Sequence, residues 1–158
     1  MNYWLFKTEP DTFGIDHLAA QTVSCWDGVR NYQARNFLRQ CAVGDLVFIY
    51  HSSCKRIGIA GIGKIVRAAY ADPSQFDKKH SAFDAASVAD NPRWTAVDVG
   101  FVEKFADVLE LSALKKHPAL QDMALLKKGS RLSVMPVTTV EYKTILMLAK
   151  TFKKTALS

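Results

Sequence analysis

The run Leu46-Val47-Phe48-Ile49-Tyr50 is the stretch of sequence that decides the fold. It is continuously apolar, and its length and its β-branched and aromatic content predict a buried strand. A second strand is predicted from Ile57 to Val66, where glycines interrupt the apolar pattern at Gly58, Gly61 and Gly63. Glycines inside a strand mark a bend, a bulge or a close approach of another backbone, as small barrels require. We therefore predict a curved, partly closed sheet.

Shorter elements flank this pair of strands. Further strands are predicted at Tyr3–Lys7, Trp94–Phe105 and Arg131–Val137. Short helices are predicted at 13–20, 111–115 and 120–128, and a longer insertion at 70–91. Strands separated by short helices, without a repeated βαβ rhythm, indicate the α+β class.

Two further helices carry clear apolar stripes. The first has Ala34, Phe37, Leu38 and Cys41 at positions i, i+3, i+4 and i+7, so its arginines, Arg30, Arg35 and Arg39, are expected to face outward. The second follows Thr138, whose spacing to Glu141 is that of a capping box.

Length and composition favour one domain over residues 1–150, followed by a basic C-terminal tail at 151–158. The net charge of +6 favours a polyanionic partner. Three cysteines at wide spacings fit neither a disulfide framework nor a zinc site, and they agree with a cytoplasmic location. We expect no metal, no cofactor, no secretory signal and no membrane span.

The richest candidate site is Ser24-Cys25-Trp26-Asp27-Gly28-Val29-Arg30-Asn31-Tyr32. It sets an aromatic ring on a tight turn beside a guanidinium and an amide. A structural loop needs the turn but has little use for the other groups. The combination predicts a pocket that stacks a planar polar ligand, and a nucleobase is the leading candidate.

Three other clusters have both a structural and a functional interpretation. Lys7, Thr8 and Glu9 either end an exposed strand or edge a pocket, where Lys7 would meet a phosphate or carbonyl and Glu9 an exocyclic amine. His51 and Ser52 either cap a turn or bind a ligand edge. Arg131 and Ser133 share a strand face that is either plain surface or reaches a phosphate or the pocket wall.

Several catalytic motifs are absent or incomplete. No nucleophile elbow is present, and His51 lies close to Cys54 in sequence without evidence of a catalytic pair. The glycines at 61 and 63 lack the spacing of a phosphate loop. We therefore expect a binding protein rather than an enzyme.

Taken together in this order and spacing, five segments resemble the EVE domain family. They are Tyr3–Pro10, Trp26–Arg35, Gly44-Asp45, Tyr50–Ser52 and Arg131–Val137. The chain is also similar to the thymocyte nuclear protein family, but without the basic N-terminal extension expected of its nuclear eukaryotic members, so we expect a bacterial form.

The resemblance implies a PUA-like fold, a small β-barrel flanked by helices and related to the YTH and ASCH domains. It also implies binding of DNA or RNA that carries a modified base, such as 5-methylcytosine, turned out of its stack. Carried onto this sequence, the base pocket comprises Lys7, Thr8, Glu9, Trp26, Val29, Arg30, Asn31, His51, Ser52 and Ser133. Arg35 and Arg131 are assigned to the nucleic-acid backbone.

Two rival functions remain open at this point. ASCH relatives include small amidohydrolases, so Lys7, Thr8 and Glu9 are alternative catalytic residues acting on an acylated base or nucleoside. The other rival is an interaction module with a vestigial pocket.

Overall fold

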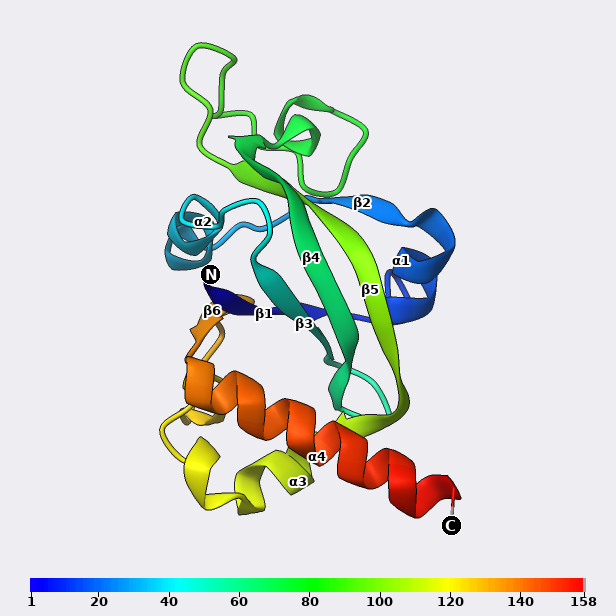
Figure 1. The fold of residues 1–158 in the computed structure, drawn as a ribbon. Helices are drawn as coiled ribbons and strands as arrows, with labels where there is room; N and C mark the ends of the chain where they lie inside the picture. Colours follow the sequence, from blue (N-terminus) through cyan, green and yellow to red (C-terminus); the bar gives the residue numbers. More distant parts are fainter. Residues whose placement is uncertain (158) are drawn as a thin grey trace.

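The computed structural model describes residues 1–157, and it describes side chains for residues 1–151. Six strands form one mixed sheet in the order β2-β5-β4-β3-β1-β6. Strands β1 and β3 are parallel, and the other neighbours are antiparallel (Figure 1). The strands are β1 (Tyr3–Thr8), β2 (Val23–Trp26), β3 (Leu46–His51), β4 (Gly58–Ala71), β5 (Thr95–Glu110) and β6 (Val134–Val137).

The expected barrel is wrong, because the sheet stays open. Its edge strands, β2 and β6, have four residues each, and each pairs with one neighbour. Two helices contact the sheet beside these edges. α1 (Ile15–Gln21) contacts β2 and β5, and α2 (Tyr32–Leu38) contacts β6 and β5. Helix packing therefore covers the side that strand pairing would have closed.

The remaining helices differ in part from the prediction. α3 (Leu111–Lys116) forms where it was expected. The helix expected at 120–128 is replaced by two 3-10 turns, η2 (Pro118–Leu120) and η3 (Ala124–Leu126). A third 3-10 turn, η1 (Pro73–Phe76), lies at the start of the 72–94 loop. The residues that this segment buries are Leu120, Met123 and Leu125, a spacing that no single helical face provides.

Helix α4 (Thr139–Leu157) begins at the predicted capping box. The Glu141 carboxylate accepts from Thr138 N at 2.9 Å, and the Thr138 hydroxyl accepts from Glu141 N at 3.1 Å. The helix continues through the residues expected to form a basic tail. The side chains from 152 onward, including Lys153 and Lys154, lie outside the described side chains. No described helix is both long and apolar enough to cross a membrane.

The core has two parts, one on each face of the sheet. Along β3, Val47 and Ile49 join the part that packs against α1 and α2, whereas Phe48 and Tyr50 join the part under α3 and α4. Alternate side chains of a strand point to opposite faces, so this strand is buried on both. That is why its sequence is continuously apolar rather than alternating.

Close backbone packing explains a predicted glycine of β4. A Cβ on Gly61 would lie 2.3 Å from the Glu103 carbonyl oxygen and 2.7 Å from Ile15 Cδ1. The pairing of β4 with β5 shifts register on either side of this position. The glycine therefore marks a bend with a close backbone approach, as the sequence predicted.

A methyl group at Gly61 has no space, so Gly61→Ala is expected to lower the free energy of unfolding by about 1–3 kcal/mol. Urea denaturation measures the change. Ala69→Val adds two methyl groups at an exposed position of the same strand and should shift stability by less than about 0.5 kcal/mol. Equal effects of the two changes would contradict this packing.

Candidate functional site

A cavity of about 690 Å³ opens where β1 and β2 end beside the loop that enters α2. This volume lies within the range of small-molecule sites. Its walls come from the end of β1, the loop before α1, the last residue of α1, all of the Ser24–Asn31 segment and the residue before β6. They are lined by Lys7, Thr8, Thr12, Phe13, Gln21, Ser24, Cys25, Trp26, Asp27, Gly28, Val29, Arg30, Asn31 and Ser133.

Trp26 both lines the cavity and belongs to the core. It is the last residue of β2 rather than a turn residue, and 7% of it is exposed. Its ring lies 5.4 Å from that of Phe6 and 5.7 Å from that of Phe13, the latter edge-on at 86°. The indole is therefore held rigidly by aromatic neighbours while it forms part of the cavity wall.

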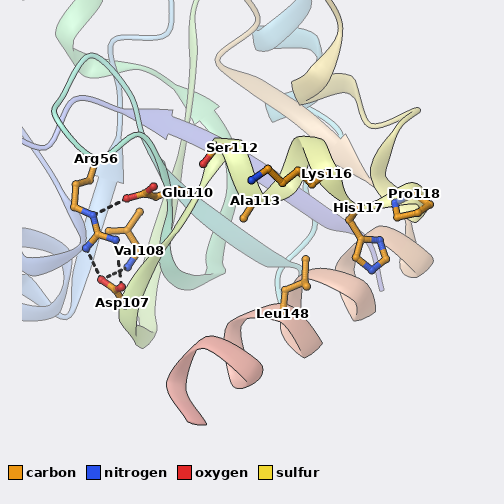
Figure 2. Close-up of a pocket in the computed structure, with 10 residues that line it drawn as sticks. All are labelled: Arg56, Asp107, Val108, Glu110, Ser112, Ala113, Lys116, His117, Pro118 and Leu148. Atoms are coloured by element: carbon orange, nitrogen blue, oxygen red, sulfur yellow. Dashed lines mark hydrogen bonds and ion pairs between the residues drawn. The ribbon is translucent and has the colours of Figure 1, made fainter. Parts of the chain in front are cut away.

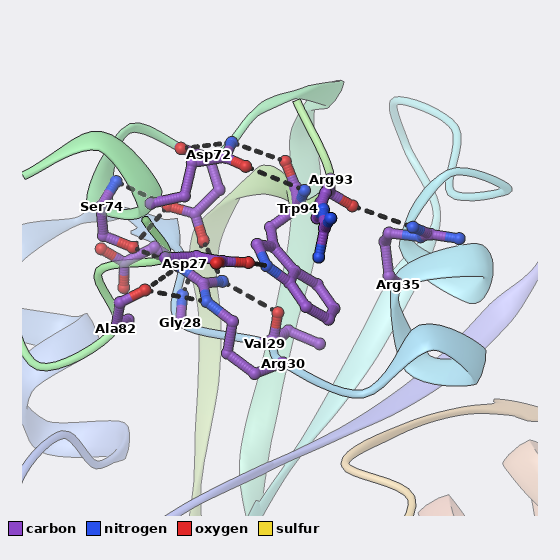
Figure 3. Close-up of polar contacts among 12 residues, drawn as sticks. Asp27, Gly28, Val29, Arg30, Arg35, Asp72, Ser74, Ala82, Arg93 and Trp94 are labelled. Carbon is purple, nitrogen blue, oxygen red and sulfur yellow. Dashed lines mark hydrogen bonds and ion pairs between the residues drawn. The ribbon is translucent and has the colours of Figure 1, made fainter. Parts of the chain in front are cut away.

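Arg30 is held by a dense set of hydrogen bonds at the edge of the cavity (Figure 3). Nε donates to Ala82 O at 3.0 Å, and Nη2 donates to Ala82 O at 2.8 Å and to Ser74 Oγ at 3.1 Å. Nη1 donates to Val29 O and to the Asp72 carboxylate, both at 2.9 Å. These bonds engage all five N–H groups that an arginine has. Arg30 therefore braces the wall instead of facing outward as expected, and its direct contact with a base stays a prediction.

Asp72 completes this brace from the other side. Its carboxylate is fully buried and also accepts hydrogen bonds from Gly28 N at 2.9 Å and from Ser74 N at 2.7 Å. Burial alone would raise the pKa of Asp72, but the hydrogen bonds from Ser74, Arg30 and Gly28 outweigh it and hold that pKa below its ordinary value. The ionised carboxylate thus ties the loop after Trp26 to the start of the 72–94 loop.

The far end of the 72–94 loop is anchored by buried polar contacts. The Gln75 amide donates to Asp72 O at 2.7 Å and to Trp94 O at 3.0 Å, and its oxygen accepts from Trp94 N and from Ser87. The Trp94 indole donates to Asp84 at 2.7 Å. The segment expected to be a long insertion is therefore held by hydrogen bonds at both ends.

Removing the Asp72 carboxylate leaves four donating groups on three residues without their acceptor, so Asp72→Ala is expected to cost about 3 kcal/mol of stability. It should also speed amide hydrogen exchange across residues 73–93. Asp77→Ala removes an exposed carboxylate from the same loop and serves as the control, with an expected change under about 0.5 kcal/mol. Unchanged exchange in the Asp72 variant would show that this carboxylate does not hold the loop.

Two residues at the end of β1 line the cavity as predicted. Lys7 is half-buried, and burial lowers the pKa of its ammonium group. Its Nζ lies 5.8 Å from the centre of the Tyr50 ring. The Thr8 hydroxyl donates to Phe13 O at 2.6 Å, which orients it within the wall.

Val29, Asn31 and Ser133 also line the cavity. Arg35 and Arg131, which were assigned to the nucleic-acid backbone, do not line it. The Asn31 side-chain oxygen accepts from Ala34 N at 2.9 Å and caps α2. Arg131 lines an adjoining hollow of about 380 Å³, which shares Asn31 with the main cavity. Arg35 donates to Arg93 O at 3.0 Å and lies 4.7 Å from the ring of Tyr32.

Three predicted pocket residues lie outside the cavity lining: Glu9, His51 and Ser52. The Glu9 carbonyl accepts from Phe13 N at 2.8 Å, and Ser52 N donates to Thr8 O at 2.9 Å. His51 Nε2 accepts from Ile15 N at 3.1 Å. Their contacts in the structure organise the neighbouring backbone, and their role in binding stays a prediction.

The His51 contact generates a pH dependence of stability. Burial lowers the pKa of His51 below its ordinary 6.5, so folding favours the neutral ring that accepts from Ile15. The stability that the neutral His51 ring contributes is fully present above about pH 6.5, and it is lost as the pH falls through the lower folded-state pKa of His51. His51→Gln keeps an acceptor that does not titrate, so its unfolding free energy should fall less between pH 7.5 and 5.5 than that of the parent chain. Identical losses would contradict this account.

Sequence reasoning missed part of the lining. Thr12, Phe13 and Gln21 line the cavity although they lie outside the segments singled out from the sequence. Asp27, which was treated as a turn residue, is the one carboxylate in the lining. The sequence signal that could have identified Asp27 as a lining residue was its position directly after Trp26.

A second cavity, of about 520 Å³, lies between α3, α4, the end of β5 and the loop before β4 (Figure 2). One wall is an ion network in which Arg56 bonds to Asp107 and, at 2.8 Å, to Glu110. The other walls are mixed polar and apolar: Val108, Ser112, Ala113, Lys116, His117, Pro118 and Leu148. The ring of His117 is the lone aromatic side chain of this lining, so the cavity lacks the indole platform of the first one.

The family model described as "EVE domain" matches residues 2–148. The chain belongs to the EVE domain family. It is 46% identical to thymocyte nuclear protein 1 of Danio rerio, over 92% of this chain and 71% of the relative. It is 43% identical to the human protein of that name, over 93% of this chain and 73% of the relative.

Solved structures agree with this assignment. The crystal structure of a Pseudomonas syringae protein superposes with a TM-score of 0.92 at 52% identity, covering 93% of this chain and 99% of that one. Human THYN1, solved in complex with DNA containing 5-methylcytosine, superposes with a TM-score of 0.90 at 42% identity, covering 94% and 98%. The Mmi1 YTH domain shares the fold at 9% identity, with a TM-score of 0.57, covering 98% and 78%.

Proposed function

We propose that this EVE domain binds nucleic acid by receiving one modified base, such as 5-methylcytosine, in the cavity beside Trp26. The observation that carries the proposal is the rigid indole in the wall of a hollow of about 690 Å³. The human relative bound to DNA with 5-methylcytosine supports the choice of ligand. The base would leave its stack at a cost of a few kcal/mol.

The polar and apolar parts of the lining have separate tasks in this proposal. Stacking on Trp26 would provide about 1–3 kcal/mol for any base. A methyl group packed beside Val29 adds only about 0.8 kcal/mol. Discrimination must therefore come from the cavity's shape and from hydrogen bonds that a wrong base leaves unmade.

The adjoining hollow offers a path for the nucleic-acid backbone. It contains the cations Lys127 and Arg131 and no carboxylate. Neither cation has an ion pair among residues 1–151. Because the two hollows share Asn31, a phosphate there would neighbour the base in the main cavity, consistent with the net charge of +6.

The amidohydrolase alternative finds less support in the geometry. Lys7 and Thr8 line the cavity, but Glu9 does not, and the Thr8 hydroxyl is already a donor to Phe13 O. The three residues therefore do not converge on one point. Hydrolysis of acylated cytosine that is lost in Lys7→Ala would favour this alternative over a reader.

Trp26 is the decisive residue, and Trp26→Ala is expected to abolish discrimination between modified and plain oligonucleotides. Loss of stacking should weaken binding roughly 5- to 150-fold, measured by fluorescence anisotropy. Because the ring also packs in the core, Ser24→Phe provides a second variant that fills the cavity without opening a core void. It should abolish binding as well.

Ser112→Phe makes the same change in the second cavity and is the matched control. It should leave binding unchanged. Unaltered discrimination in the Trp26 and Ser24 variants would exclude this cavity as the binding site.

A further inference from the structure

Asp27 is the one carboxylate in the lining of the main cavity. It lies directly after the Trp26 platform, at a position where 39% of its side chain is exposed. Within residues 1–151, the Asp27 carboxylate contacts its own backbone N–H and has one ion-pair partner, His80, whose Nε2 lies 3.9 Å from Asp27 Oδ2. That separation is too long for a hydrogen bond, so the carboxylate keeps free acceptor capacity.

The residues on both sides hold Asp27 in place. Trp26 pairs with Val97 in the sheet. Gly28 takes a left-handed conformation, with φ of +78°, and its N–H donates to the Asp72 carboxylate at 2.9 Å. An acceptor at position 27 is thus set beside the indole by fixed neighbours rather than by a free loop.

The charges around Asp27 leave the negative charge of its carboxylate only partly compensated. Partial burial, followed by the nearby negative charge of Asp72, raises the pKa of Asp27. Arg30 cannot neutralise it fully, because its N–H groups are engaged elsewhere. A ligand that brings an N–H donor to this carboxylate would satisfy it.

We propose that Asp27 determines which pyrimidine the cavity accepts, by taking a hydrogen bond from the exocyclic 4-amino group of a cytosine-type base. This inference rests on the proposed function of the same cavity. From the sequence, this task was expected of Glu9, which lies outside the lining, whereas Asp27 belongs to the lining. Acidic side chains are the usual acceptors for the amino group of cytosine.

The need for such a residue follows from the shape of the bases. 5-Methylcytosine and thymine carry the same 5-methyl group and have nearly the same outline, so neither stacking nor a methyl pocket separates them. They differ at position 4, where one presents an amine and the other a carbonyl oxygen. A carboxylate accepts from the amine and repels the oxygen, so it discriminates at that atom.

The test uses short single-stranded oligonucleotides that differ in one base: 5-methylcytosine, cytosine or thymine. The parent chain should bind 5-methylcytosine at least roughly tenfold more tightly than thymine. In Asp27→Asn the new amide can donate to the thymine oxygen, so that ratio should fall toward one. The ratio of 5-methylcytosine to cytosine should stay unchanged, because the methyl contact is untouched.

Asp11→Asn is the matched control, since it removes an exposed carboxylate that lies next to Thr12 but outside the lining, and it should leave all ratios unchanged. An Asp27→Asn protein that keeps the parent preference for 5-methylcytosine over thymine would overturn this inference alone. A parent chain that binds none of the three oligonucleotides would overturn the proposed function together with it.

Discussion

The buried carboxylate of Asp72 is the constraint on which the architecture around the cavity depends. It accepts from the backbone of Gly28, from the guanidinium of Arg30 and from Ser74, so the segment after Trp26 and the start of the 72–94 loop meet at one charge. A buried charge is tolerated only when its hydrogen bonds are complete, and here they are. The turn after Trp26 therefore takes a single position relative to the 72–94 loop. Without that anchor the cavity would have only one rigid wall.

The second wall is rigid for a different reason. Trp26 is shared between the hydrophobic core and the cavity, held by Phe6 and Phe13. A ring packed in this way loses little conformational entropy when a base stacks on it, and such preorganisation favours binding. The same sharing couples stability to function, because changes at this ring affect both. Asp27, the proposed recognition residue, lies outside the core and is free of that coupling.

Charge is distributed in keeping with a nucleic-acid ligand. The lining of the main cavity has two cations, Lys7 and Arg30, and one carboxylate, Asp27. Arg30 is already paired with Asp72, so the cavity suits a neutral polar base. The adjoining hollow contains cations alone among its charged residues. In the second cavity, Arg56 is paired with two carboxylates, so no excess positive charge remains on that wall. This separation of charge agrees with the proposed placement of the base in the main cavity and of a phosphate in the adjoining hollow.

The sequence by itself determined the local elements and the family. Apolar runs and stripes identified β1, β3, α2 and α4, because the spacing of the apolar residues in each element matches the faces that the element buries. The Trp26–Asn31 segment was recognisable as a candidate site because it sets a ring that can stack on a base beside groups that can hydrogen-bond to one. Only the tertiary structure decided that the sheet stays open, since closure depends on whether α1 and α2 occupy the space between the edge strands. It also decided that Arg30 braces a loop 42 residues away and that Asp27 rather than Glu9 faces the cavity. Contacts between distant segments depend on how the whole chain packs, and no local pattern of residues contains them.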